Sequence, residues 1–374
     1  MDTSETERLY LLVYACSMEE FFYLYVIILF FVLREVLMRK VTNKGFCLCA
    51  FLMLAMVGLR DIHCGADTWN YCDFFVNPKK STTYYSIQGV EPGFRVLNSI
   101  IGIFSHNENF YLFVTALITF CPIYWYIGKY SSCKVMSLFV FLTFGTATMM
   151  YFMSFYLMRQ YLSIAFLSLA IVFYKKNNEK INKNVVLLYC IALSMHIASL
   201  IFLPVFYKYK SVSKKNVILL FVITFVIGSI TTHYFSDFYA LGALIGKGQY
   251  LQNNAERFYQ YMMTLPLFAL GTMFVLFTDE GHLKLIEYRS LYFAVVFNNL
   301  FSIVDYSDRT IVYFLFPLLV LIPNAFNYMK IKILYKVIAF AVFVAYYSYK
   351  YYSVLNLYSE FQNDSPVPYR SCLY

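Results

Sequence analysis

Three arginines stand where apolar stretches of the sequence end, at the places where a membrane helix would meet water. They are Arg60 after residues 46–59, Arg159 within 157–174 and Arg309 before 311–328. A guanidinium stays charged in a partly desolvated site and binds phosphate through two parallel hydrogen bonds. Because a charge inside a membrane costs about 2.5 kcal/mol or more at the bilayer centre, Arg159 is expected to face a partner. That partner is a carboxylate such as Asp67 or a ligand phosphate; for Arg309 a local ion pair in the loop that holds Asp305 and Asp308 is the alternative.

Residues 60–71 form the most polar segment of the chain. They interleave carboxylates, an imidazole, an amide, a glycine and aromatic rings, a mixture that favours binding of a polar ligand such as a sugar. The alternative is a solvated loop beside an arginine that extends toward water. On the first interpretation Asp67 is a candidate catalytic residue, and the candidate substrate contacts of this segment are Arg60, Asp61, Thr68, Trp69 and Tyr71.

The same polar stretch continues into residues 91–101, which predict an amphipathic helix at the membrane interface. Its second residue is a proline, which fits the first helical turn. Apolar residues recur at the spacing of one helix face, namely Phe94, Leu97 and Ile101. Glu91 then either stabilises the positive end of the helix dipole or acts as a catalytic carboxylate. Arg95, in the first turn, is a further candidate for substrate binding.

His196 lies in the only polar stretch of the apolar segment 185–206. A neutral imidazole accepts a proton near neutral pH, so His196 is a candidate catalytic base beside Asp67, and the sequence leaves both open. A hydrogen-bonded, buried histidine is the alternative interpretation. Gln160, which follows Arg159, is a candidate substrate contact.

The elements that would position these groups are membrane helices. Of the 374 residues, 60% are hydrophobic and only 14% charged, whereas a soluble domain needs roughly a quarter charged residues. The composition excludes a soluble globular protein and predicts an all-α polytopic membrane protein. We expect one domain over residues 1–374 with about ten to twelve transmembrane segments. The expected segments are 9–37, 46–59, 109–127, 135–153, 157–174, 185–206, 217–234, 261–278, 290–304, 311–328 and 333–351.

Basic residues between the apolar segments predict the orientation of the chain, because Lys and Arg of short loops stay on the cytoplasmic side. The net charge of +9 comes mostly from such clusters and indicates topology, not nucleic-acid binding. Clusters flank 185–206 on both sides, so a straight span there would place one of them outside. A broken helix pair that turns near residues 194–196 removes the conflict and places the connectors 60–108 and 235–260 outside. A straight helix with an external lysine cluster is the alternative.

Several reaction classes are disfavoured by missing motifs. The sequence has no P-loop, GxSxG, HExxH, dinucleotide-binding glycine pattern or metal-ligand cluster. This argues against ATP-driven transport, serine hydrolysis and zinc chemistry. We expect no metal and no cofactor, since three guanidinium groups can neutralise a diphosphate. Most cysteines lie in apolar stretches as small hydrophobic residues, but Cys64 and Cys72 share a polar loop in which a disulfide could form.

Short motifs follow one another in a fixed order, most of them at helix ends. They are Gly58-Leu59-Arg60, Gly65-Ala66-Asp67-Thr68 with Tyr71 and Phe74-Phe75, Glu91-Pro92-Gly93-Phe94, Phe155 with Arg159-Gln160, His196 with Ala198-Ser199, Arg309, and Val367-Pro368-Tyr369. In this order they resemble the EpsG-type branch of the Wzy polysaccharide polymerases over nearly the whole chain. Ala66 stands where that pattern often has threonine, and Cys64 where a small apolar residue is usual.

The resemblance implies a GT-C-like helical bundle that polymerises O-antigen (lipopolysaccharide) or capsular repeat units. The enzyme would lie in the bacterial cytoplasmic (inner) membrane with its active site facing the periplasm or exterior. A growing glycan would move from undecaprenyl diphosphate to a hydroxyl of another lipid-linked unit. The implied partners are the undecaprenyl-diphosphate-linked oligosaccharide, the bilayer, a flippase and a chain-length regulator, with no nucleic acid.

Within that reaction, we expect the arginines Arg60, Arg159 and Arg309 to hold the diphosphate. Asp67 or His196 would act on the acceptor hydroxyl. Rival functions are another lipid-carrier glycosyltransferase, an O-antigen ligase or a lipid-linked oligosaccharide flippase. A flippase needs a cavity open to both membrane faces, whereas the polar groups of this sequence crowd one face.

Overall fold

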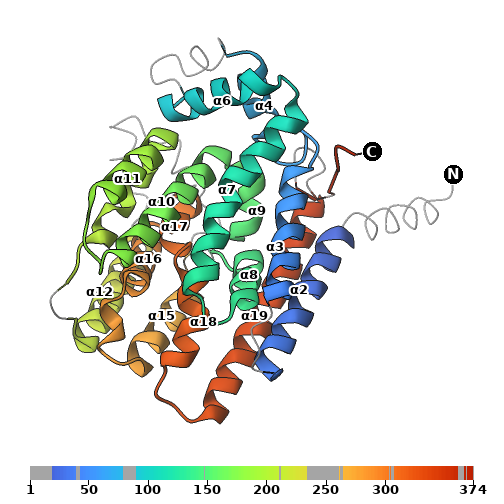
Figure 1. Ribbon diagram of the computed structural model, residues 1–374. Helices are drawn as coiled ribbons and strands as arrows, with labels where there is room; N and C mark the ends of the chain where they lie inside the picture. The colour runs from blue at the N-terminus through green and yellow to red at the C-terminus, as the bar shows by residue number, and fades with distance from the viewer. Residues whose placement is uncertain are drawn as a thin grey trace. The chain divides into compact units, whose positions relative to one another are not determined.

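The computed structural model describes residues 19–38, 43–78, 90–146, 148–209, 212–233, 261, 264–302, 304, 307–360, 366–367 and 369–373. These residues form helices and no strand, apart from isolated bridges such as the one between Arg60 and Ser371 (Figure 1). The expected all-α architecture is therefore confirmed. The connector 235–260 lies outside the described residues.

Each apolar segment expected from the sequence corresponds to one helix or to a broken pair. Most are single helices: α2 (Glu19–Met38), α3 (Asn43–Gly58), α7 (Glu108–Tyr130), α10 (Met158–Lys176), α12 (Lys214–His233), α15 (Leu265–Phe277), α16 (Ile286–Phe301) and α19 (Ile333–Glu360). The broken pairs are α8 (Lys134–Thr143) with α9 (Met150–Tyr156), α11 (Lys183–Met195) with η1 (Ile197–Phe206), and α17 (Ser307–Leu315) with α18 (Leu318–Tyr328). Short helices such as η3 (His282–Lys284) lie between them.

Among the described helices, α7, α12 and α19 are long and apolar enough to cross a membrane. The pair α17 and α18 gives a fourth candidate span, bent by 51° at Pro317, which cannot continue the helical hydrogen bonding. Several other apolar helices are shorter, with 10–17 residues. The protein is thus a polytopic, all-α membrane protein, and the expected number of about ten to twelve spans stays a prediction.

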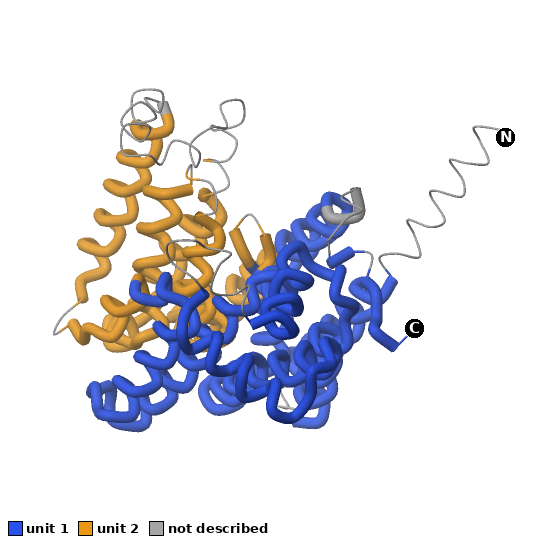
Figure 2. The backbone as a smooth tube through the Cα atoms, turned by 90° about the horizontal axis from the view of Figure 1, so that it is seen from above, with its two compact units in different colours: residues 1–144, 150–200, 344–374 blue, residues 145–149, 201–343 orange. Residues whose placement is uncertain are grey.

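The described chain forms two compact units that alternate along the sequence (Figure 2). Unit 1 contains residues 1–144, 150–200 and 344–374, and unit 2 contains 145–149 and 201–343. Every candidate site residue named above belongs to unit 1 except Arg309, which belongs to unit 2. The expectation of a single domain over 1–374 stays a prediction.

The segment 185–206 is broken, as the charge pattern predicts. Helix α11 ends at Met195, and His196 is extended with φ −157° and ψ 115°. The Tyr189 hydroxyl donates to the carbonyls of Ser199 and Leu200, each at 3.2 Å. In a straight helix ten residues span about 15 Å, so the chain turns back after His196. The straight-helix alternative is wrong, while the membrane side on which the pair enters stays a prediction.

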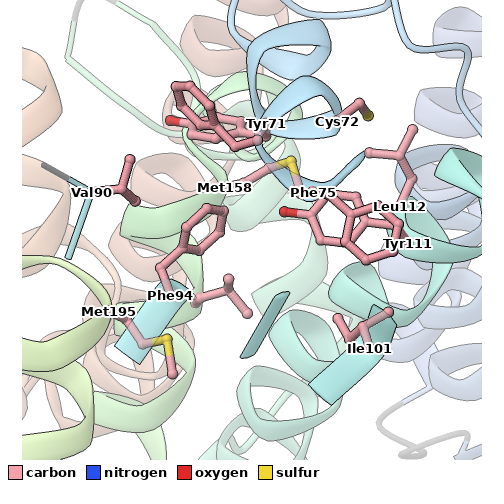
Figure 3. Packing of buried hydrophobic residues seen from close by; sticks show 12 residues of the cluster. Tyr71, Cys72, Phe75, Val90, Phe94, Ile101, Tyr111, Leu112, Met158 and Met195 are labelled. Atoms are coloured by element: carbon pink, nitrogen blue, oxygen red, sulfur yellow. The ribbon is translucent and has the colours of Figure 1, made fainter. Parts of the chain in front are cut away.

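The described residues of the polar connector 60–108 include the helices α4 (Thr68–Val76) and α6 (Pro92–Phe104), which lie together at one end of unit 1 (Figure 1). Helix α6 confirms the expected amphipathic pattern, because Phe94 and Ile101 are buried and Leu97 packs beside them. Helix α4 was not expected from the sequence. Both helices cover an apolar cluster shared with α7, α10 and α11 (Figure 3), whose members include Tyr71, Phe75, Phe94, Tyr111, Met158 and Met195.

The last described residues of the chain hold the loop that follows α3. The N–H of Cys372 donates to the Leu59 carbonyl at 2.9 Å, and the N–H of Asp61 donates to the Arg370 carbonyl at 2.8 Å. The Cys64 thiol donates to the Pro366 carbonyl at 3.5 Å. These bonds place the residues that flank the motif 367–369 beside the motifs of residues 58–68.

Candidate active site

Arg159 is the second residue of α10, and the helix begins after Leu157, where the chain departs from helical geometry with φ −100° and ψ 52°. Its guanidinium forms an ion pair with the carboxylate of Glu91, the residue that precedes α6. The two side chains are 17% and 16% exposed. The pair is therefore partly desolvated and still reachable from outside. The sequence indicated that Arg159 needs a partner but did not identify Glu91 as that partner.

Glu91 occupies the N-cap position of α6, but its side chain makes no capping hydrogen bond. One oxygen, Oε2, binds Arg159, and the other, Oε1, accepts the backbone N–H of Ile197 at 3.4 Å. The carboxylate thereby links α6, α10 and the turn that follows α11. Besides the roles expected for it, Glu91 holds these three elements together.

His196 is the residue at that turn and is half-buried. Its Nδ1 accepts the backbone N–H of Ala198 at 3.2 Å, so the neutral ring carries its proton on Nε2. The His196 carbonyl accepts both the N–H and the hydroxyl of Ser199. The motif of His196 with Ala198 and Ser199 therefore builds one hydrogen-bonded turn next to the Glu91 carboxylate.

Tyr71 contributes an aromatic face to the same place. Its ring lies 5.8 Å from the guanidinium carbon of Arg159 and belongs to the cluster below α4 and α6 (Figure 3). A cation over an aromatic face is attracted by the ring's quadrupole, more strongly where water is excluded. Arg159 is thus fixed by the carboxylate of the residue that precedes α6 and by a ring from α4.

Two glycines allow these elements to approach closely. A Cβ on Gly93 would contact the Ser194 side chain and lie 2.8 Å from the Ser194 carbonyl carbon, so only glycine lets α6 reach the end of α11. Gly65 has φ +123°, and a Cβ there would lie 2.9 Å from the Phe155 carbonyl oxygen. The Thr68 hydroxyl donates to that same carbonyl at 2.9 Å. Gly65 and Thr68 therefore join the start of α4 to the end of α9.

Several residues expected to contact substrate are buried in this structure. Thr68 is fully enclosed and Gln160 is buried. Arg60 is only 1% exposed; its guanidinium donates to the Val57 carbonyl at the end of α3 and lies 5.8 Å from the Phe155 ring centroid. A cation at the C-terminal end of a helix is stabilised by the helix dipole. In this structure Arg60 is therefore enclosed by the protein and contacts groups of the chain itself.

Two of the three expected arginines belong to unit 1 and the third belongs to unit 2. Arg60 is enclosed in unit 1, Arg159 is partly exposed there, and Arg309 belongs to unit 2 at the start of α17. The N–H of Arg309 donates to the Asp308 carboxylate at 2.9 Å, which is a backbone contact. A joint role of all three on one diphosphate stays a prediction.

Other candidates lie on the surface of the connector 60–108. Trp69 and Arg95 are exposed, while Asp61 and Asp67 are half-buried. The Asp61 carboxylate accepts the N–H of His63 at 2.9 Å. Asp67 is the N-cap residue of α4, one helical turn before Tyr71, and makes no side-chain capping bond. Asp67 therefore stays a candidate next to the Tyr71–Arg159 contact.

Cys64 and Cys72 are buried free thiols, so the disulfide considered for them is not formed. Burial raises the pKa of the Cys64 thiol to about 11 and that of Cys72 to about 12. Both therefore serve as small hydrophobic residues at neutral pH. Within the described residues, no group of three or more His, Cys, Asp or Glu side chains could hold a metal ion.

The family model of the EpsG family matches residues 43–371. The chain belongs to the EpsG family. No curated protein and no solved structure matches it. The EpsG match covers Arg159, Glu91 and His196, and it also covers Pro366 and Arg370, two of the C-terminal residues that hold the loop after α3. Membership identifies a membrane protein of the polysaccharide polymerase type, with glycosyltransferase-like activity.

Proposed function

We propose that this EpsG-family protein polymerises O-antigen or capsule by joining undecaprenyl-diphosphate-linked repeat units. The reaction would take place on the outer face of the bacterial cytoplasmic membrane. The family match supports the polymerase class. One observation supports a role for particular residues: Arg159 is partly exposed at a helix end, where Glu91 and Tyr71 fix its position.

In the proposed reaction, the acceptor hydroxyl oxygen forms a bond to the anomeric carbon of the donor glycan. The bond from that carbon to the diphosphate oxygen breaks, and the diphosphate keeps the electron pair. The hydroxyl proton passes to a base. Arg159 stabilises the negative charge that develops on the departing diphosphate, because a preorganised guanidinium costs no reorganisation when the charge appears.

Glu91 is a positioning residue in this mechanism, since it holds Arg159 and the turn after His196. His196 has its Nδ1 engaged by Ala198, which makes the neutral ring a hydrogen-bond donor through Nε2. That arrangement favours Asp67 as the base and His196 as a donor to a sugar or phosphate oxygen. Trp69, which is exposed beside Asp67, offers an aromatic face to a sugar ring.

The test is the ladder of surface polysaccharide from cells that lack the gene and from cells in which it is restored. Loss of the ladder with retention of a single repeat unit, reversed by the wild-type gene, supports polymerisation. Loss of even the single unit would contradict it and point to ligation, flipping or assembly of the unit. Arg159→Ala in the same strain ties the activity to the site.

A further inference from the structure

A cavity of about 420 Å³ lies beside α6 and includes none of Arg159, Glu91 and His196 in its lining. Its polar lining comes from Arg95, Asn98 and Ser99 on α6 and from His106, which follows that helix. Ile103 and the aromatic residues Phe74 and Phe75 complete most of the wall. We call it the α6 cavity.

The titratable residues that line the α6 cavity are basic. Among the described residues that line it, Arg95 and His106 are the titratable ones, and none carries a carboxylate. Arg95 is exposed, so its guanidinium is available to a ligand. Ser99, one turn later, donates its hydroxyl to the Arg95 carbonyl at 3.0 Å and stays on the same helix face. The cavity therefore complements an anion.

Helix α6 has three distinct faces. One face, with Phe94, Asn98 and Ile101, is buried against the rest of unit 1. The next carries Arg95, Ser99 and Gly102 along the α6 cavity. The third is apolar and exposed, with Val96, Ile100, Ile103 and Phe104.

The exposed apolar face continues directly into the α6 cavity. Ile103 and Phe104 are 79% and 76% exposed, and Ile103 also lines the cavity. A helix that turns an apolar face outward next to a basic polar face lies in the interface of a bilayer, with the basic residues at the level of the head groups. The hydrocarbon chains of a lipid would cover the third face while its phosphate enters the cavity.

We propose that the α6 cavity binds the phosphate of a lipid head group, with Arg95 as the main contact. Two lipids share this chemistry: an anionic phospholipid of the bilayer and a polyprenyl diphosphate. The α6 cavity uses residues to which the proposed mechanism gives no role, and only its polyprenyl diphosphate arm rests on the proposed function. Because lipid binding is measured without any glycosyl transfer, it can fail while the polymerase proposal holds, and the reverse.

The test measures lipid retention by native mass spectrometry on the purified full-length protein. Phosphatidylglycerol is the anionic probe, and phosphatidylcholine at the same concentration controls for acyl-chain binding. The variants are Arg95→Gln, Arg95→Lys and a matched control, Arg370→Gln, whose exposed arginine belongs to unit 1 but does not line the cavity. Because one basic residue near the head groups contributes about 1 kcal/mol, Arg95→Gln should weaken phosphatidylglycerol binding roughly fivefold.

Arg95→Lys should retain most of the binding, and Arg370→Gln should match the wild type. The proposal would be overturned if Arg95→Gln retained as much phosphatidylglycerol as the wild type. It would also be overturned if Arg95→Gln lost phosphatidylcholine to the same extent as phosphatidylglycerol. Adding geranylgeranyl diphosphate then assigns the source. Displacement of phosphatidylglycerol at equimolar concentration identifies a polyprenyl diphosphate site, and displacement only in large excess identifies a phospholipid site.

Discussion

Glu91 at the start of α6 and Arg159 at the start of α10 form an ion pair although they lie 68 positions apart in the sequence. The pair joins the connector 60–108 to a helix of the bundle. Because both side chains are mostly buried, their attraction is screened less than that of a surface pair. Helix α6 cannot leave α10 without exposing an unpaired charge to a partly desolvated site. The connector is therefore part of the site itself.

Arg159→Ala should abolish polymer while the protein stays in the membrane. Removing one group that stabilises developing charge typically costs roughly 10²–10³ in kcat. Arg159→Lys should recover little, because an ammonium cannot bind phosphate through two parallel bonds. The measurement is the polysaccharide ladder together with an immunoblot of the membrane fraction. Full activity of Arg159→Lys would contradict the phosphate role, and Arg370→Ala serves as the matched control.

Glu91→Gln should be less damaging than Glu91→Ala. The amide oxygen of glutamine can still accept from Arg159 or from the N–H of Ile197, so orientation is partly kept. Loss of the charge-assisted bond corresponds to roughly tenfold in rate, and complete loss of the side chain to roughly a hundredfold. Initial rates of polymer formation from purified lipid-linked units would show this order. If both variants lost the rate of polymer formation to the same extent, Glu91 would instead be identified as the catalytic carboxylate.

Arg60→Ala should lower stability rather than only activity. The guanidinium of Arg60 is enclosed, binds the Val57 carbonyl and lies near the Phe155 ring. Losing these contacts is expected to cost about 1–3 kcal/mol and to lower the melting temperature in detergent. Arg370→Ala, at an exposed position, is the control. A stable Arg60→Ala protein without polymerase activity would restore Arg60 to the diphosphate site.

Hydropathy and charge were sufficient to place the main helices, because burial in a bilayer demands long apolar runs. The break at His196 was also predicted, since only a turn reconciles the lysine clusters on both sides. The bend at Pro317 and helix α4 were not expected. Residues 68–76 mix polar and aromatic side chains, and their helical form depends on packing Tyr71 and Phe75 over the cluster in Figure 3.

The candidate site was predicted by residue type but not by pairing. Arg159 and His196 were candidates because each is a polar residue in an apolar stretch; the structure places Arg159 and the turn after His196 beside Glu91, and their catalytic roles stay predictions. Their link through Glu91 joins segments that are far apart in the sequence, and no local spacing encodes such a contact. Arg60 and Thr68 lie in the same polar segment, residues 60–71, as the exposed Trp69, and only the fold distinguishes those that are buried.

Cys64 and Cys72 should resist a maleimide reagent in the native protein at pH 8. Burial raises the pKa of Cys64 to about 11, so only about a thousandth of it is thiolate at that pH. The exposed Cys47, Cys121 and Cys190 are controls for reagent access once the lipid is replaced by detergent. In denaturant all of these thiols should react. A pair that stays unreactive in denaturant until a reductant is added would show that Cys64 and Cys72 form a disulfide after all.

Gly93→Ala should disable the site although alanine is the better helix former. The new Cβ would lie 2.8 Å from the Ser194 carbonyl carbon, so α6 must move away from α11, and Glu91 moves with it. Overpacking of this kind costs typically about 1–3 kcal/mol. Gly281→Ala is the control, since a Cβ there would meet nothing within 4 Å. We expect the first variant to lose most polymer and the second to match the wild type. Normal polymer from Gly93→Ala would show that the close approach of α6 to Ser194 is not needed for activity.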